Sequence, residues 1–181
     1  MTLGSIAVIA ELLSSTPFAS FPVEEKLVLT TEEFLATINF PDPLDFKVVQ
    51  YILENPSSLY TLTPRKFEKF IANVVQELGY SVKLGKGSKD GGVDILAERS
   101  VPFGKELMIV QCKRNREDRK VEESTVKQLY TDIAIRDASR GLIVTTSDFT
   151  RGARKFMEMY KYKIDDFTKV NPHLRWGTPK V

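Results

Sequence analysis

The apolar residues from Thr63 onward are spaced as on one face of a helix. Thr63 is a good N-cap, and Pro64 suits the first helical position. Apolar side chains then recur at helical spacing: Phe67, Phe70, Ile71, Val74, Val75 and Leu78. Because Gly79 suits the position after a helix, the pattern predicts a helix that begins at residue 64 and ends just before this glycine.

Three strands are expected next. Residues 80–84 alternate between apolar and polar side chains, residues 93–97 form a short apolar run, and residues 107–113 are apolar on both faces. A strand that is apolar on both faces is typical of the centre of a sheet. The polar, glycine-rich segment 85–92 indicates a loop between the first two strands. It lacks the Lys-Ser/Thr ending of a nucleotide-binding P-loop, so we exclude that kind of phosphate site.

The second half of the chain alternates helix and strand. Residues 121–137 predict a helix, residues 141–145 a fourth strand, and Asp148 or Thr150 the cap of a helix that runs to about Tyr160. Three early strands can form an antiparallel meander, and the following helix can carry the chain across the sheet to the fourth strand. The predicted fold class is therefore α/β, a mixed β-sheet flanked by helices. The residues after the last helix are weak for a further buried strand.

The first third of the chain is less regular. Prolines interrupt its short apolar stretches, Thr31 fits the start of a short helix, and residues 43–54 carry apolar side chains at helical spacing. We therefore predict that residues 1–60 form a small helical domain or an N-terminal extension. Residues 61–167 form the main domain, and residues 168–181 form a C-terminal tail.

Composition excludes several classes of protein. The chain has 181 residues, of which 42% are apolar and 28% are charged, as in a globular protein with a core. One cysteine and one histidine allow neither an intrachain disulfide nor a zinc site of clustered Cys and His ligands. The N-terminus lacks the positive flank of a secretory signal, and its apolar run is too short to span a bilayer. We expect a cytoplasmic protein without membrane association.

The net charge of +2 is unevenly distributed along the chain. Residues 1–60 contain 2 basic and 8 acidic side chains, a net of −6, and the other residues contain 24 basic and 16 acidic side chains, a net of +8. A basic domain favours a polyanionic partner such as nucleic acid. An ordinary solvated surface explains the same distribution equally well.

Three polar residues interrupt the apolar strands. Gln111 and Lys113 share one face of the third strand, and Cys112 points to the other face. Asp94 lies near the start of the second strand, so all three polar residues can meet at one edge of the sheet if these strands pair. Carboxylate and amide oxygens suit Mg²⁺ or Mn²⁺, and a nearby lysine can orient water or stabilise charge on a phosphate. Taken singly, Asp94 also fits a turn and Lys113 a solvated strand end.

Four segments carry a family resemblance. They are LTPRKFE at residues 62–68, KDGGVDILA at residues 89–97, IVQCK at residues 109–113 and GLIVTTS at residues 141–147. In this order and spacing they resemble the catalytic domain of Mrr-type restriction endonucleases, within the PD-(D/E)xK nuclease superfamily. The resemblance implies a restriction-endonuclease-like fold and metal-dependent hydrolysis of phosphodiester bonds in DNA. It also implies a role in restriction or another defence against foreign DNA.

The resemblance implies a role for particular residues. Asp94 matches the metal-binding aspartate, Lys113 matches the catalytic lysine, and Gln111 stands where the wider superfamily has a second acid. Glu68 matches a first-helix glutamate that completes the metal site directly or through water. The backbone carbonyl of Cys112 is a further implied ligand. The implied cofactor is Mg²⁺, with Mn²⁺ as an alternative.

Basic residues near these motifs are candidates for contacts with DNA. They are Lys86 and Lys89 in the glycine-rich loop, and Arg114, Arg116, Arg119 and Lys120 after the third strand. A solvated loop explains the basic run 113–120 as well as a phosphate-binding loop does. The hydroxyls of Thr145, Thr146 and Ser147 either donate to phosphate or end the fourth strand.

Two other functions fit the same residues. Glutamine in place of an acid lowers the charge of the site, so the domain could bind DNA without cutting it. Alternatively, the chain could be a junction-resolving or RNA-processing nuclease. Cutting both strands of a duplex uses two active sites at once or in turn, which favours a homodimer.

Overall fold

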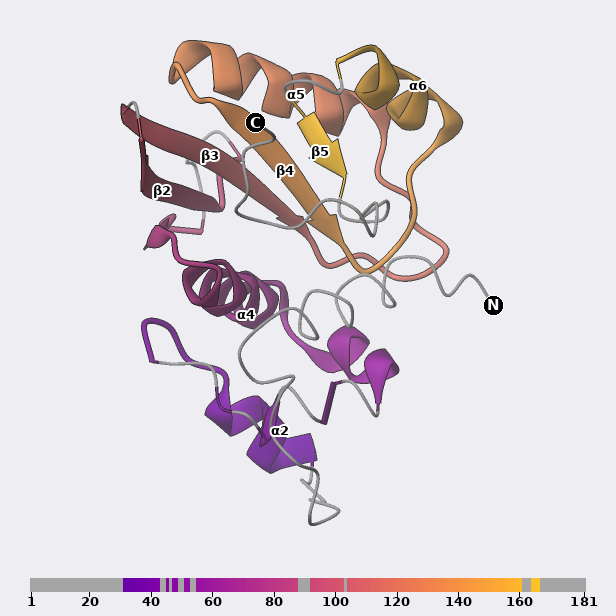
Figure 1. Ribbon diagram of the computed structural model, residues 1–181. Helices are drawn as coiled ribbons and strands as arrows, with labels where there is room; N and C mark the ends of the chain where they lie inside the picture. Colours follow the sequence, from indigo (N-terminus) through magenta and orange to yellow (C-terminus); the bar gives the residue numbers. More distant parts are fainter. Residues whose placement is uncertain are drawn as a thin grey trace.

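A single mixed sheet organises the computed structural model, with helices on both of its faces (Figure 1). The structure describes residues 31–42, 45, 47–48, 51–52, 55–87, 92–102, 104–160 and 164–166. The five strands lie in the order β1-β2-β3-β4-β5. Strands β1, β2 and β3 form an antiparallel meander, and β3, β4 and β5 are parallel. The predicted α/β sheet flanked by helices is confirmed.

The strands are β1 (Ser81–Leu84), β2 (Ile95–Val101), β3 (Gly104–Lys113), β4 (Arg140–Thr145) and β5 (Ile164–Asp166). The helices are α2 (Thr31–Thr37), the 3₁₀ helix η2 (Pro56–Thr61), α4 (Pro64–Glu77), α5 (Glu123–Ile135) and α6 (Arg151–Met159). Helix α4 covers one face of the sheet through a core that includes Phe67, Phe70 and Val110. Helices α5 and α6 cover the other face through a core that includes Leu129 and Ile143.

Helix α4 begins as the sequence predicts. The Thr63 hydroxyl accepts a hydrogen bond from the backbone N–H of Lys66 at 3.2 Å, which caps the first turn. After the helix, Gly79 adopts a φ of +87°, a conformation that favours glycine, and the chain turns back into β1. Because only residues 78–80 connect α4 to β1, the first turn of α4 lies at the same end of the sheet as the last residue of β1.

Strands β2 and β3 extend further than the apolar pattern indicates. They pair as far as Val101 and Gly104, and Lys105 of β3 forms an ion pair with Glu98 of β2 at 2.6 Å. Polar cross-strand pairs stabilise a hairpin without any apolar alternation, which is why the sequence prediction stopped short. The chain also adds β5 as a three-residue edge strand, and Ile164 anchors it in the core.

Helix α5 begins at Glu123, two residues later than predicted. Val121 instead forms an isolated parallel bridge with Phe149, and its backbone N–H donates to the carbonyl of Asp148 at 2.7 Å. This bridge fastens the start of α5 to the loop that leads from β4 into α6. Apolar side chains at positions 121 and 149 therefore serve the loop packing rather than the helix.

The described part of the first third packs against α4. Ile38, Val48 and Ile52 belong to the same core as the apolar face of α4. The Lys66 ammonium donates to the carbonyl of Ile38, and the Asn73 amide donates to the carbonyl of Asn39, both at 2.8 Å. Residues 1–30 and 167–181 lie outside the described residues, and the domain boundaries stay a prediction. No helix in the described part of the chain is long and apolar enough to cross a membrane.

Candidate active site

Strand register brings the three predicted chain positions to one end of the sheet. Ile95 pairs with Val110, so Asp94, one residue earlier, stands opposite Gln111. The backbone N–H of Asp94 donates to the carbonyl of Val110 at 3.2 Å, which continues the pairing past the end of β2. Lys113 is the last residue of β3 and pairs with Thr145, the last residue of β4. The expectation that Asp94, Gln111 and Lys113 lie at one edge of the sheet is met.

The Asp94 carboxylate is held against β3 in a half-buried position. Its Oδ2 accepts a hydrogen bond from the backbone N–H of Cys112 at 2.6 Å. The pKa of Asp94 is raised to about 6, mainly by burial, and the nearby Glu68 carboxylate contributes to this rise. The hydrogen bond from Cys112 and the charges of Lys113 and Arg65 lower the pKa but do not outweigh burial. The raised pKa means that burial disfavours the charged form of Asp94. A cation bound to the carboxylate would stabilise that form.

The Gln111 side chain is buried with its oxygen unsatisfied. It is 3% exposed, and its Oε1 has no hydrogen-bond partner among the described residues. Its Nε2 lies 3.0 Å from the position that a Cβ on Gly92 would take, and Gly92 has a φ of +91°. A buried amide oxygen without a donor is costly. It is a suitable ligand for a hard cation beside Asp94, so the donor set fits the implied metal.

Helix α4, which packs on the face of β3 to which Cys112 points, supplies a second carboxylate. Glu68 lies one turn after Arg65, and its Oε2 accepts from the Arg65 guanidinium at 2.7 Å. The Glu68 side chain is only 12% exposed, whereas that of Arg65 is 42% exposed. Both charges act on Asp94. Glu68 therefore lies close enough to Asp94 to act on its charge, and its role at a metal stays a prediction.

Lys113 is fixed through its backbone. Its carbonyl accepts from the Thr145 hydroxyl at 2.8 Å and from the backbone N–H of Thr146 at 3.3 Å. Its ammonium makes no hydrogen bond or ion pair within the part of the chain that the structure describes. Cys112, between Gln111 and Lys113, packs into the core beneath α4, and burial raises the pKa of its thiol well above the usual range. Cys112 thus faces the core, as predicted, and its thiol stays protonated.

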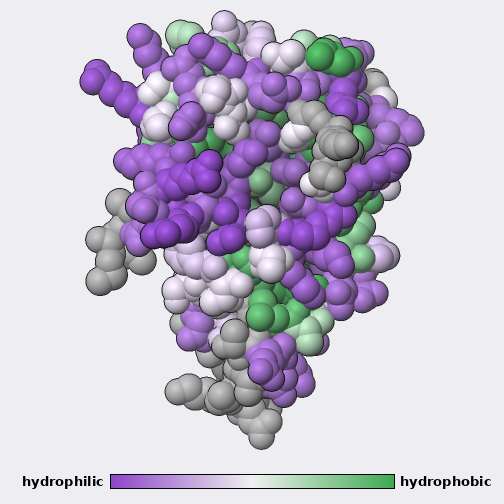
Figure 2. Space-filling model, turned by 180° about the vertical axis from the view of Figure 1, so that it is seen from behind, coloured by the Kyte–Doolittle hydropathy of each residue, from purple (hydrophilic) through white to green (hydrophobic). Residues whose placement is uncertain are grey.

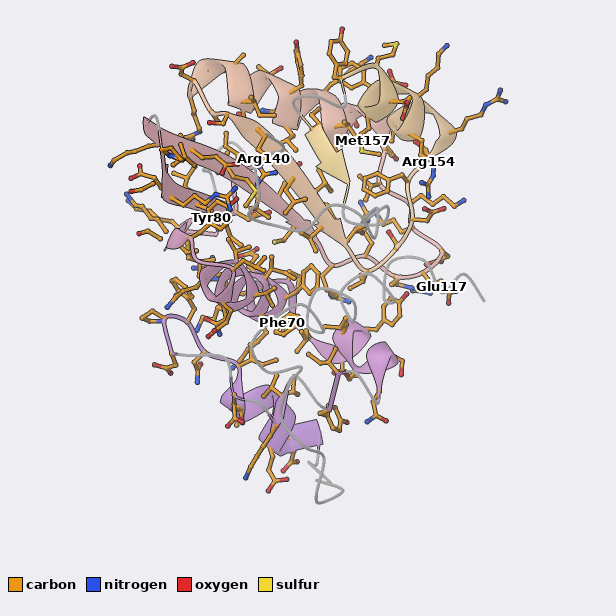
Figure 3. The ribbon with its side chains drawn as sticks, viewed as in Figure 1. Phe70, Tyr80, Glu117, Arg140, Arg154 and Met157 are labelled. Atoms are coloured by element: carbon orange, nitrogen blue, oxygen red, sulfur yellow. The ribbon has the colours of Figure 1, made fainter. Side chains whose placement is uncertain are left out.

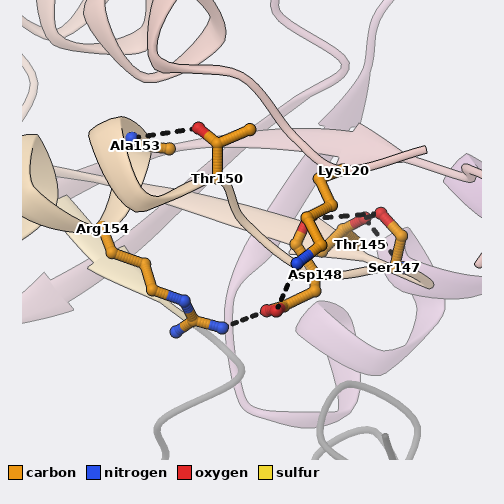
Figure 4. A network of polar contacts seen from close by, with 7 residues as sticks. All are labelled: Lys120, Thr145, Ser147, Asp148, Thr150, Ala153 and Arg154. Carbon is orange, nitrogen blue, oxygen red and sulfur yellow. Dashed lines mark hydrogen bonds and ion pairs between the residues drawn. The ribbon is translucent and has the colours of Figure 1, made fainter. Parts of the chain in front are cut away.

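The hydroxyls that follow β4 are used inside the protein. Thr145, Thr146 and Ser147 are each less than 5% exposed. The Thr145 hydroxyl accepts from the backbone N–H of Ser147 at 3.1 Å, and the Thr146 hydroxyl donates to the carbonyl of Asn115 at 2.7 Å. Asp148 then pairs with Lys120 and Arg154 (Figure 4). Because these hydroxyls bond within the protein, they are more consistent with terminating the strand than with binding phosphate.

The basic residues predicted to contact DNA differ in their surroundings. Arg114 is half-buried, and its Nε has no hydrogen-bond partner among the described residues. Arg116 pairs with Asp118 at 3.4 Å, Lys120 pairs with Asp148 at 3.8 Å, and Arg119 is exposed. Lys86 is exposed just after β1, and Lys89 lies outside the described residues. The structure thus keeps several cations at the surface near the ends of β1 and β3.

Two features of the charged residues were missed from the sequence. One is Arg65, whose position three residues before Glu68 was the available signal. The other is a charged cluster at the far end of the sheet, where Glu106 pairs with Arg140 at 2.8 Å and with Arg99. Tyr80 accepts from Arg140 at 2.7 Å in this cluster, well away from Glu117 in Figure 3. No spacing in the sequence signals this cluster, because its members come from separate strands.

Hydrophilic residues dominate the face seen from behind, and apolar side chains show in separate patches (Figure 2). The large apolar side chains that are exposed in the described part are Val101, Ile135 and Met159. Within the same residues no group of three or more His, Cys, Asp or Glu side chains could hold a metal. The candidate centre instead combines two carboxylates with an amide oxygen.

Comparisons with known proteins bear on the family and the fold of the chain. The restriction endonuclease family model for Mrr catalytic domains matches residues 59–169. The uncharacterized protein y4cE of Sinorhizobium fredii is 30% identical over 126 residues, which cover 68% of this chain and 32% of that protein. The type IV methyl-directed restriction enzyme EcoKMrr of Escherichia coli K12 is 32% identical over 116 residues, which cover 61% of this chain and 36% of that enzyme. The chain thus spans about a third of the length of these relatives.

A solved structure supports the fold. The restriction endonuclease MspJI in complex with a 27-mer oligonucleotide superposes with a TM-score of 0.50 at 20% identity, covering 79% of this chain and 32% of that one. At this level of identity the similarity concerns the fold alone. The family match, in contrast, extends over more than half of the chain and includes α4, the whole sheet, Asp94, Gln111 and Lys113. The chain therefore belongs to the restriction endonuclease family that the Mrr catalytic domain defines.

Proposed function

We propose that this chain is a metal-dependent DNA endonuclease domain that acts in restriction of foreign DNA. The observation that carries the proposal is the buried Oε1 of Gln111, which has no hydrogen-bond partner among the described residues, on the strand position opposite Asp94. A protein tolerates such an orphaned oxygen where a ligand completes it. Membership of the restriction endonuclease family supplies the reaction class.

Asp94, Gln111 and the backbone carbonyl of Cys112 would hold Mg²⁺, or Mn²⁺ in its place, and Glu68 would complete the site directly or through water. A bound Mg²⁺ polarises a phosphate oxygen and lowers the pKa of a bound water. The other contributions come from groups of the protein itself. Asp94 supplies one of the two negative charges of the site, and the backbone N–H of Cys112 holds that carboxylate in place.

Lys113 is the proposed catalytic lysine. Its backbone is fixed by the end of β4, while its ammonium has no partner within the described residues. A positioned ammonium can orient an attacking water and stabilise the charge that develops on a phosphate. Because Lys113 follows Gln111 by two residues, both side chains lie on the same face of β3.

DNA contacts are proposed for the basic residues around this centre: Lys86, Lys89, Arg114, Arg116, Arg119 and Lys120. Arg114 is the most specific of them, because its half-buried Nε lacks a partner in the described part of the chain. A homodimer is proposed for cutting both strands, and a cytoplasmic location for an enzyme that meets foreign DNA. The methyl-directed activity printed for EcoKMrr suggests methylated DNA as one substrate to test.

The test is nicking of supercoiled plasmid by the purified chain in Mg²⁺ or Mn²⁺, with methylated and unmethylated substrates and an EDTA control. We expect metal-dependent nicking that disappears in Lys113→Ala and Asp94→Ala. Lys105→Ala is the matched control, because Lys105 lies at the far end of the same strand and is exposed. Nicking that survives in Lys113→Ala, or no cleavage by the wild type, would contradict the proposal.

A second candidate function is DNA binding without cleavage. It is favoured by the small number of acidic ligands, since Gln111 replaces an acid and no group of three or more His, Cys, Asp or Glu side chains that could hold a metal occurs in the described part. One or two carboxylates bind Mg²⁺ weakly. Salt-sensitive DNA binding with no nicking under any metal would support this function. Preferential cleavage of branched DNA or of RNA would instead indicate a junction-resolving or RNA-processing nuclease.

A further inference from the structure

Arg65 lies at the candidate centre, but the proposed metal site and catalytic lysine give it no role. It is the second residue of α4, at the end of the helix that lies beside the ends of β1 and β3. Its guanidinium donates to Glu68 at 2.7 Å, and its Nη1 lies 3.3 Å from the position that a Cβ on Gly87 would take. The Arg65 guanidinium therefore lies beside both Glu68 of α4 and Gly87, which follows β1.

The exposure of the pair shows which partner meets the solvent. Glu68 is 12% exposed and Arg65 is 42% exposed, so the arginine is the more solvent-exposed partner of the ion pair. Arg65 also lies close enough to Asp94 to lower the pKa of that carboxyl. Two negative charges, Asp94 and Glu68, thus face two positive charges, Lys113 and Arg65. A divalent cation on the carboxylates would replace the need for Arg65 as the counter-charge of Glu68.

We propose that Arg65 is a phosphate-binding residue of the active centre, held by Glu68 in the free protein and turned to a DNA phosphate once a metal takes up that carboxylate. This inference rests on the proposed function. A guanidinium presents parallel N–H groups that match two oxygens of one phosphate. The solvent-facing side of Arg65 leaves such a fork open to a strand of DNA that reaches Asp94. Gly87, with a φ of +87°, keeps the space beside the guanidinium free of a side chain.

The test is binding of a fluorescently labelled DNA duplex, measured by anisotropy over a range of salt concentrations. Ca²⁺ is used in one series and EDTA in the other, so the readout is affinity rather than cleavage. In Ca²⁺, Arg65→Gln is expected to weaken binding roughly tenfold. It should also reduce the slope of log K against log salt by about 0.9, the loss of one phosphate contact. Arg65→Lys keeps the charge but loses the two parallel N–H groups, so its affinity should lie between that of the wild type and that of Arg65→Gln.

The Glu68→Gln background separates phosphate binding from simple neutralisation of Glu68. In this background no carboxylate holds Arg65, so adding Arg65→Gln should weaken binding by the full tenfold even in EDTA. If that loss vanishes in the Glu68→Gln background, Arg65 only neutralises Glu68 and the inference is wrong. The double variant also leaves no buried carboxylate without a partner, so a folded comparison remains if Arg65→Gln alone fails to fold.

A distant arginine supplies the matched control. Arg136 is exposed and follows α5 at the end of the sheet away from Asp94, so Arg136→Gln should leave affinity and salt slope unchanged. An equal loss in Arg136→Gln and Arg65→Gln would mean general electrostatics and would overturn the inference. Wild-type protein that binds no duplex would reject the proposed function and the inference together. Wild-type binding that Arg65→Gln leaves unchanged would reject the inference alone.

Discussion

The backbone N–H of Cys112 donates a 2.6 Å hydrogen bond to Oδ2 of Asp94. This bond ties the proposed metal-binding carboxylate to the strand that carries Gln111 and Lys113, so the positions of all three side chains depend on one pairing. The bond stabilises the charged form of Asp94, yet burial still raises the pKa of the carboxyl to about 6. The charged form of Asp94 therefore lowers the stability of the folded protein, and a cation bound to the carboxylate would offset this cost.

Asp94→Asn is expected to stabilise the protein at pH 8. In the unfolded chain the Asp94 carboxyl ionises near its ordinary pKa of 3.8, and in the folded chain near 6. Between these values the folded state binds more protons, so the contribution of Asp94 to the free energy of unfolding falls as the pH rises, and the full cost remains above 6. After allowance for partial exposure that cost is on the order of 1–2 kcal/mol.

Urea unfolding of both proteins at pH 4 and pH 8 tests this expectation. The introduced asparagine keeps an oxygen acceptor for the Cys112 N–H but carries no charge, so the two proteins should be similar at pH 4 and differ at pH 8. Asp118→Asn is the control, because Asp118 is exposed in its pair with Arg116 and should show little change at either pH. A variant that is less stable than the wild type at pH 8 would contradict the argument.

Gln111→Glu is expected to lower stability without metal and to raise the response to Mg²⁺. The new carboxylate would be buried beside Asp94, which costs roughly 1–3 kcal/mol when no cation neutralises it. An added negative oxygen ligand strengthens binding of a hard cation, so the rise in Tm on adding Mg²⁺ should exceed that of the wild type.

Thermal melts with and without Mg²⁺ measure both effects. Gln76→Glu is the matched control, because Gln76 is exposed on α4 and gains a solvated charge. Its Tm and its response to Mg²⁺ should equal those of the wild type. An equal Mg²⁺ response in Gln111→Glu and the wild type would show that Gln111 does not contact the metal.

Gly92→Ala is expected to damage the site as well as the fold. The Cβ would sit 3.0 Å from Nε2 of Gln111, in a backbone conformation with a φ of +91°. Gly79→Ala carries the same kind of backbone strain at a φ of +87° but meets no atom within 4 Å. Both variants should lose about 1 kcal/mol through strain, and only Gly92→Ala should also lose nicking activity. Equal nicking rates in the two folded variants would mean that Gly92 does not position Gln111.

The sequence predicts well those elements that follow a strong apolar pattern. Helix α4 and strand β3 lie where their apolar residues indicate, because each buries a continuous face or both faces in a core. The outer half of the β2–β3 hairpin escapes prediction because polar pairs such as Glu98 and Lys105 stabilise it. The three-residue β5 is equally hidden, since one buried Ile164 and edge pairing suffice to hold it.

The candidate site follows the same rule. Asp94, Gln111 and Lys113 could be brought together from the sequence because adjacent strands in a meander pair antiparallel and alternate their side chains. The ion pair between Arg65 and Glu68 could be predicted from helical spacing. The proximity of Arg65 to Gly87 could not be predicted, because it depends on how β1 folds back along α4. The unsatisfied oxygen of Gln111 depends on the packing around it, which spacing does not reveal.

Thr145→Val is expected to loosen Lys113 at the end of β3. The Thr145 hydroxyl donates to the carbonyl of Lys113 at 2.8 Å and accepts from the backbone N–H of Ser147 at 3.1 Å. Valine keeps the shape but leaves the Ser147 N–H without that acceptor in a buried position, which costs about 1–2 kcal/mol.

Urea unfolding and plasmid nicking measure the two consequences of this change. Thr131→Val is the control, because its exposed hydroxyl only bonds back to the carbonyl of Lys127 within α5. That variant should stay within about 0.5 kcal/mol of the wild type and nick at the same rate. For Thr145→Val we expect nicking to fall under conditions in which the protein is fully folded, because Lys113 loses the shortest hydrogen bond to its carbonyl. Full nicking activity in folded Thr145→Val would show that the end of β4 does not position the proposed catalytic lysine.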